Sequence, residues 1–174
     1  MKPMLLQFRQ GQFIALTVFV AAVLGACAPI VPGSSREADV LSRYGTPTAQ
    51  RALADGGKVL DFSGQPLGVE NWRFTMSADG TVRSAEQLLD EAHFSRIRQG
   101  MTRDEVIGEI GLSAASETQR YPGLNEEALS WRYMEPGGRR YFFNAHFDAS
   151  SGRLKHTSRT PDPVDNNVNT DSSP

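Results

Sequence analysis

One succession of local patterns occurs twice in this 174-residue chain, and this internal repeat constrains the fold more than any other feature. In each copy, a helix ending at a glycine precedes alternating apolar and polar residues, a turn with Asp and Gly, and a further strand. The repeat predicts an α+β fold in which two short helices pack on a three-stranded antiparallel sheet, twice over. The first unit, residues 35–88, is degenerate because it lacks the leading short helix, and the second unit is residues 89–160. The alternative is one mixed α+β domain over residues 35–160.

The second unit has clear signals for two helices. Thr102 and Glu105 have the spacing of a capping box, in which each side chain accepts a hydrogen bond from the other residue's backbone amide. Gly111 is the glycine expected to end this helix. Phe94 and Ile97 indicate a short helix before it. The apolar stripe of the capped helix consists of Val106, Ile107 and Ile110.

The rest of the second unit alternates with period two, the pattern of strands that have one buried face. Turn signals at residues 136–138 and 148–152 separate the alternating runs. The sequence therefore predicts three antiparallel strands at Leu129–Tyr133, Tyr141–Phe147 and Leu154–Ser158.

The first unit repeats this order more faintly. Ser35 can cap a helix that ends at Gly45. The expected apolar face of that helix consists of Val40, Leu41 and Tyr44. Asp79-Gly80 is a signal for a tight hairpin. The predicted strands of this unit are residues 58–62, 71–76 and 82–88.

A family resemblance rests on the stretch from Ile97 to Gly111, Ile-Arg-Gln-Gly-Met-Thr-Arg-Asp-Glu-Val-Ile-Gly-Glu-Ile-Gly. It resembles the signature of a small outer-membrane lipoprotein family of the β-barrel assembly machinery, the BamE (SmpA/OmlA) family. The strand Trp131-Arg-Tyr133 and the turn from Phe147 to Leu154 also match. The resemblance implies two helices on a three-stranded antiparallel sheet. It also implies a non-enzymatic accessory subunit that helps outer-membrane β-barrels to insert.

Two features depart from that family. Leu112-Ser113 replaces the usual residue and proline after the terminal glycine, although Gly45-Thr46-Pro47 keeps this pattern in the first unit. The family has one such unit, whereas this chain has two. Tandem units also resemble the β-lactamase inhibitory protein type, whose concave sheet surface binds another protein. A protein-binding module of inhibitor or sensor type is therefore the alternative function.

The N-terminus has the three parts of a secretory signal peptide: basic residues, an apolar run and small residues before a cleavage site. Lys2 and Arg9 precede an apolar stretch from Phe13 to Leu24, and Gly25-Ala26-Cys27 follows. Because it ends on Cys27, the only cysteine of the chain, this segment resembles the lipobox of bacterial lipoproteins. The resemblance implies cleavage between Ala26 and Cys27 and acylation of Cys27 with a diacylglycerol and a fatty acid such as palmitate.

A transmembrane anchor and an ordinary secretory signal with an incidental cysteine are the alternatives. The apolar run has about a dozen residues, whereas a helix that spans a bilayer needs roughly 20. We therefore expect residues 1–26 to be a signal peptide and residues 27–34 to be a lipidated N-terminus and linker. Ala28 stands where an Asp would favour the inner membrane, so we expect a lipid anchor in the outer membrane, facing the periplasm.

Charge limits the partners of the mature chain. Lys2 and Arg9 are the only charged side chains before Cys27, so their removal makes the net charge more negative than the −2 of the full chain. A nucleic-acid partner would require a basic face, and we expect none. We expect contact with outer-membrane lipid through acylated Cys27 and with a protein, either the β-barrel assembly complex or another envelope protein. Residues 161–174 are polar and predict a disordered tail.

Aromatic residues are the candidate partner-binding anchors, because such side chains dominate many interfaces. The alternative is packing between sheet and helices, since about half of the side chains on a strand of period two face the core. We favour packing for two of the four, Trp131 and Tyr133. The four candidates are Trp72, Trp131, Tyr133 and Tyr141.

No residue pattern points to catalysis or to a cofactor. The three histidines, His93, His146 and His156, lack the i, i+4 spacing of metal ligands on a helix and have no cysteine partners, so no metal site is expected. We expect His146 and His156 to be a surface pair on neighbouring strands, and Glu126 and Glu127 to lie in a solvated loop. The chain has neither a Gly-rich phosphate loop nor a nucleophile elbow, so we do not expect an enzyme.

Overall fold

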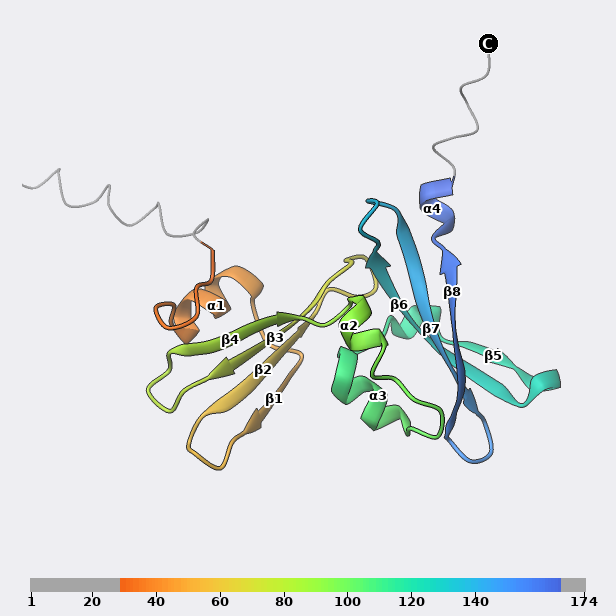
Figure 1. Ribbon diagram of the computed structural model, residues 1–174, viewed down its shortest axis with the longest axis horizontal. Coiled ribbons are helices and arrows are strands. Elements are labelled where there is room, and N and C mark those ends of the chain that lie inside the picture. Colours follow the sequence, from red (N-terminus) through yellow and green to blue (C-terminus); the bar gives the residue numbers. More distant parts are fainter. Residues whose placement is uncertain (1–28, 167–174) are drawn as a thin grey trace, which may run out of the picture.

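The computed structural model describes residues 29–166, which form two antiparallel four-stranded sheets (Figure 1). The first sheet contains, in spatial order, β1 (Ala49–Ala52), β2 (Lys58–Ser63), β3 (Asn71–Met76) and β4 (Val82–Gln87). The second sheet contains β5 (Gln119–Tyr121), β6 (Glu126–Met134), β7 (Arg140–Asp148) and β8 (Leu154–Pro161). The helices are α1 (Glu37–Tyr44), α2 (Glu91–Phe94), α3 (Arg103–Ile110) and α4 (Pro163–Asn166), with 3-10 turns η2 (Ala115–Glu117) and η3 (Pro122–Leu124).

The predicted fold class is wrong. Each sheet has four antiparallel strands instead of the three that the repeat predicts. The additional strands, β1 and β5, are short, and every residue in them is exposed. A strand exposed on both faces has no apolar alternation, so the period-two pattern could not reveal it. The same finding overturns the three-stranded sheet that the family resemblance implied.

The second unit packs α2 and α3 against one face of its sheet. The hydroxyl of Thr102 accepts from the amide of Glu105 at 3.2 Å, and the carboxylate of Glu105 accepts from the amide of Thr102 at 2.7 Å. The predicted capping box is therefore confirmed. In Figure 1, both helices lie on the side of the sheet that faces the first unit. The core between helices and sheet includes Phe94, Ile97, Val106, Ile110, Trp131, Tyr133, Phe143, Phe147 and Leu154.

The first unit packs α1 on its sheet, but the helix does not begin at the expected residue. Arg36, and not Ser35, is the N-cap, and its amide donates to the carboxylate of Asp39 at 2.7 Å. Val40 is buried as expected, whereas Leu41 is 38% exposed and lies off the apolar face. The core of this unit consists of Val40, Leu60, Phe62, Phe74, Met76 and Val82.

A buried asparagine joins the two units. Asn71 of β3 is fully buried, and its Nδ2 donates to the carbonyl oxygens of Ile110 at 2.8 Å and Leu112 at 3.1 Å. Gly111 lies between these two carbonyls with a φ of +77°, and a Cβ atom there would come 2.8 Å from Nδ2 of Asn71. The glycine that ends α3 therefore also permits the close approach of β3.

Residues at both ends of the described chain belong to the folded units. The amide of Gly33 donates to the carbonyl of Val82 at 2.8 Å, and Ile30 packs partly buried on the first core. Pro161 ends β8 and Asp162 is 1% exposed. The fold of the second unit therefore extends past residue 160, into the segment that was expected to be disordered.

The N-terminal segment that is predicted to anchor the protein is not among the described residues. The signal peptide, the cleavage site after Ala26 and the lipidation site Cys27 lie outside the described residues, as do residues 167–174. Among the helices of residues 29–166, none has the length and apolar character that crossing a membrane requires.

Candidate functional site on the outer face of the second sheet

Three of the four aromatic candidates for partner binding lie on the helix-covered face of the second sheet. Trp131 is fully buried, and its Nε1 donates to the carbonyl of Gly111 at 2.9 Å. Tyr133 is 4% exposed, and its ring meets that of Phe94 edge-on with centroids 4.9 Å apart. Tyr141 is partly buried and packs on the same core. The structure therefore gives Trp131 and Tyr133 the packing role that we favoured for them.

Trp72, the fourth candidate, lies in the first unit and is partly buried. Its ring stacks on Phe74 with centroids 6.0 Å apart, and its Nε1 donates to the carboxylate of Glu70 at 2.8 Å. Together with Tyr44 and Phe62, it lines an open hollow of about 450 Å³. Of the four aromatic candidates, Trp72 is thus the one at the edge of a surface hollow of the first unit.

The face of the second sheet opposite α2 and α3, here called the outer face, carries a row of small polar side chains. The register places Ser130 of β6 opposite Asn144 of β7, and Asn144 opposite Ser158 of β8. Residues opposite each other on antiparallel strands share a face and interact. Ser130 Oγ donates to Asn144 Oδ1 at 2.7 Å, and Asn144 Nδ2 donates to Thr160 Oγ1 at 3.1 Å. The row is therefore hydrogen-bonded across the sheet.

The polar row forms part of an open hollow of about 350 Å³. Gln119 of β5, Glu117 of η2 and Pro163 of α4 also line this hollow. Ser130 and Asn144 are only 5% and 9% exposed, and the hydrogen bonds from Ser130 to Asn144 and from Asn144 to Thr160 give both side chains partners at that depth. Hydroxyl and amide groups suit the backbone and neutral side chains of another protein.

A shielded ion pair closes one end of the row. Asp162 is 1% exposed and accepts a hydrogen bond from Nε of Arg132 at 2.6 Å. The guanidinium of Arg132 also lies over the ring of Phe142, 4.9 Å from its centroid. Breaking a buried ion pair leaves a charge buried without a partner, which is costly. This contact therefore holds the end of β8 beside the hollow.

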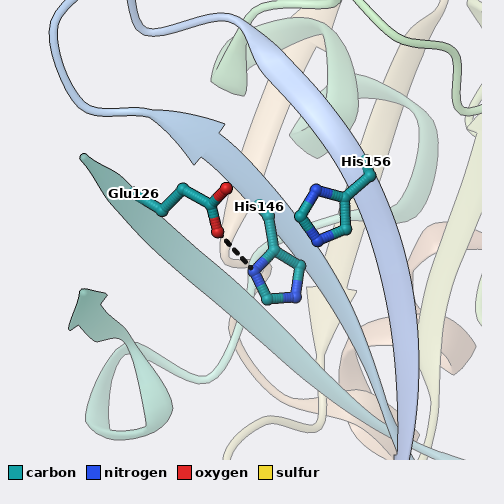
Figure 2. A group of neighbouring side chains, drawn as sticks. All are labelled: Glu126, His146 and His156. Atoms are coloured by element: carbon teal, nitrogen blue, oxygen red, sulfur yellow. Dashed lines mark ion pairs between the residues drawn. The ribbon is translucent and has the colours of Figure 1, made fainter. Parts of the chain in front are cut away.

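Three potential metal ligands lie at the other end of the outer face: Glu126, His146 and His156 (Figure 2). His146 pairs directly with His156 across β7 and β8, and their rings stack with centroids 4.3 Å apart. The predicted placement of the two histidines on neighbouring strands and one face is confirmed. Figure 2 shows the carboxylate of Glu126 pointing toward His146, with Oε2 3.5 Å from Nδ1.

The expectation of a solvated loop at Glu126 and Glu127 is wrong. Glu126 begins β6 with a side chain only 7% exposed, and Lys155 Nζ lies 2.6 Å from its Oε1. Glu127 forms an ion pair with Arg103 of α3. The turn at residues 148–152 could have indicated that positions 146 and 156 are neighbours. Glu126 comes from a different hairpin, so sequence spacing carries no signal for it.

Contacts and burial shift the pKa values of Glu126 and His146. The hydrogen bond from Lys155 lowers the pKa of Glu126 below its usual value, which favours the carboxylate. Burial, and then the neighbouring His156, lowers the pKa of His146, which favours the neutral imidazole. Nε2 of His146 lies 2.9 Å from Ser158 Oγ, whereas its buried Nδ1 has no hydrogen-bond partner among the described residues.

No protein-family model matches this chain, and no curated protein matches it. The candidate site is therefore defined by its geometry. It consists of a hydrogen-bonded polar hollow on the outer face of the second sheet, with an ion pair at one end and a histidine pair at the other.

Proposed function

We propose that this protein is a non-enzymatic outer-membrane lipoprotein facing the periplasm, where it is an interaction subunit in the assembly of envelope or outer-membrane β-barrel proteins. The lipobox ending at Cys27 supports the anchor and the compartment. The resemblance of residues 97–111 to the BamE family supports the role in assembly. A doubly or triply acylated cysteine holds a protein stably at a membrane surface without a spanning helix.

The observation that carries the proposal is the polar hollow on the outer face. The hollow is open and lies on paired strands. Its side chains Ser130, Asn144 and Thr160 are already hydrogen-bonded to one another, so a partner would bind a preformed surface. Its groups near Ser130, Asn144 and Thr160 are neutral hydrogen-bonding side chains. These groups match a polypeptide better than a polyanion, which would call for a basic surface.

The residues of the family signature stabilise the fold of the second unit. Thr102 caps α3, Val106 and Ile110 are fully buried, and Gly111 provides both a positive φ and a carbonyl for Trp131. A motif whose residues face inward supports a shared architecture more than a shared partner. The binding surface must therefore be tested separately from the motif.

The test is affinity purification of the lipoprotein from gently solubilised outer membranes, with bound proteins identified by mass spectrometry. We expect subunits of the β-barrel assembly complex with the wild-type chain and none with Cys27→Ala, which removes the anchor. Thr160→Arg, which fills the hollow, should also lose them. Thr157→Arg is the matched control, because Thr157 is exposed on the same strand but points to the opposite face.

Two results together would refute the proposal. One is the absence of assembly subunits from the wild-type preparation, and the other is unchanged outer-membrane protein levels after deletion of the gene. Recovery of assembly subunits with Thr160→Arg at wild-type levels would refute the hollow as the binding surface, and would leave the anchor and the complex in place.

A periplasmic binding module of inhibitor or sensor type is the second candidate, and the hollow beside Trp72 favours it. The surface of that hollow is mostly apolar, and its lining includes Tyr44, Phe62 and Trp72, aromatic side chains of the kind that anchor interfaces. Under this alternative, a single stoichiometric partner other than the assembly complex copurifies with the chain, and Trp72→Ala releases it while the chain stays folded.

A further inference from the structure

A carboxylate oxygen and an imidazole nitrogen face each other at one end of the outer face. Oε2 of Glu126 lies 3.5 Å from Nδ1 of His146, and that Nδ1 is buried without a hydrogen-bond partner among the described residues. In the tautomer in which Nε2 donates to Ser158 Oγ, the lone pair of the neutral imidazole is on Nδ1. Nδ1 and the carboxylate oxygen are then placed to bind one cation together.

The contacts of Glu126 direct one of its carboxylate oxygens toward His146. Lys155 binds Oε1 of Glu126, at 2.6 Å, and leaves the other oxygen, Oε2, directed toward His146. A carboxylate and a neutral imidazole are the forms in which these side chains bind a metal ion.

His156 provides a third ligand at the same place. It lies directly opposite His146 in the register, and ligand atoms of all three residues lie within 4.8 Å of one another. Zinc binds imidazole nitrogen at about 2.0–2.1 Å and carboxylate oxygen at about 2.0–2.2 Å. The exposed ring of His156 must therefore rotate out of its stack with His146 to reach the same ion.

We propose that Glu126, His146 and His156 bind one Zn²⁺ ion, with a coordination position left open to the hollow side of the sheet. Two imidazoles and one carboxylate are a ligand set that zinc takes with water or another group at its fourth position. Ser158 acts behind His146 by fixing the orientation of its ring. The ion ties β6, β7 and β8 together, and a side chain of a bound protein can occupy the open position.

The test is a Zn²⁺ titration of the full chain in detergent, by calorimetry and by competition with a chromophoric chelator. Every variant carries Cys27→Ser, which removes the only thiol of the chain. We expect one Zn²⁺ per chain and a rise in Tm with Zn²⁺, because a ligand that binds only the folded state stabilises it. His156→Ala should weaken binding by about tenfold or more and reduce the rise in Tm, since loss of even an outer-shell partner costs about 10–100-fold.

Because His156 is exposed, His156→Ala should fold, and it tests the site even if His146→Ala or Glu126→Gln does not fold. The matched control is His93→Asn, which removes the remaining histidine but keeps a donor near Asp90, and it should bind Zn²⁺ like the parent. Failure of the parent chain to bind Zn²⁺ would overturn the proposal. Equal affinity in the parent and in His156→Ala would overturn it as well.

Discussion

The side-chain amide of Gln65 pairs with both backbone groups of Arg132, 67 residues further along the chain. Its Nε2 donates to the carbonyl of Arg132 at 2.8 Å, and its Oε1 accepts from the amide of Arg132 at 2.9 Å. One side chain of the first unit thus makes the contacts that a neighbouring strand would make with β6. Together with Asn71, it links the two units through hydrogen bonds.

Gln65→Ala should therefore destabilise the protein. The substitution leaves the amide and the carbonyl of Arg132 without their partner, and a partly buried unsatisfied pair costs about 1–2 kcal/mol. Denaturant unfolding measures this loss. Gln65→Glu keeps the acceptor and loses the donor, so it should fall between the wild type and Gln65→Ala. Equal stability of all three chains would show that this contact does not hold the units together.

Gly111→Ala should destabilise the protein by about 2–3 kcal/mol, because a side chain at that φ and ψ is strained and meets Asn71. Gly108 is the matched control. It lies inside α3, with no atom within 4 Å of the position of an added Cβ, so Gly108→Ala should stabilise by about 0.5–1 kcal/mol. Opposite signs for the two substitutions, measured by thermal or denaturant unfolding, are expected. Equal effects would contradict the junction described for Gly111.

The local features of the fold could be predicted because their partners are close in sequence. The capping box joins Thr102 to Glu105, three residues apart, and the six strands with a buried face follow the apolar alternation. The strands β1 and β5 could not be predicted, because all their residues are exposed. The contact of Gln65 with Arg132 could not be predicted either, since it joins residues of the two units that are far apart in the sequence.

The candidate site was predictable only in part for the same reason. Period two placed His146 and His156 on one face, and the hairpin register confirms it. The aromatic pattern does not indicate which face of the sheet the helices cover. Trp131 is buried because it lies on the face that α2 and α3 cover. Glu126 joins the histidines from a separate hairpin, so its role depends on the pairing of β6 with β7.

Trp131→Ala and Trp72→Ala should separate packing from binding. Trp131 is fully buried, and its truncation should cost about 3–5 kcal/mol, enough to unfold a marginally stable chain. Trp72 is only partly buried, so Trp72→Ala should leave a folded protein with a smaller loss. Circular dichroism with denaturant unfolding measures both. A larger loss for Trp72→Ala than for Trp131→Ala would contradict the core assignment.

The phenol of Tyr133 should ionise only in strongly alkaline solution. Burial raises its pKa from 10.0 to about 12, with the carboxylate of Glu135 acting in the same direction. Between these two values the folded chain holds a proton that the unfolded chain has lost, so stability falls as the pH rises from 10 to 12. An absorbance titration should show one late phenolate step that disappears in Tyr133→Phe. The same titration curve in both chains would contradict the burial of this hydroxyl.

The central claim is that a protein partner binds the hollow on the outer face of the second sheet, and site-specific photo-crosslinking in intact cells tests it most directly. A photo-reactive amino acid at Gln119 sits at this hollow, and one at Gln50 sits on the exposed β1 of the first sheet as the control. We predict a crosslink to a subunit of the β-barrel assembly complex from position 119 and none from position 50. Crosslinks from position 50 alone, or none from position 119, would contradict the account.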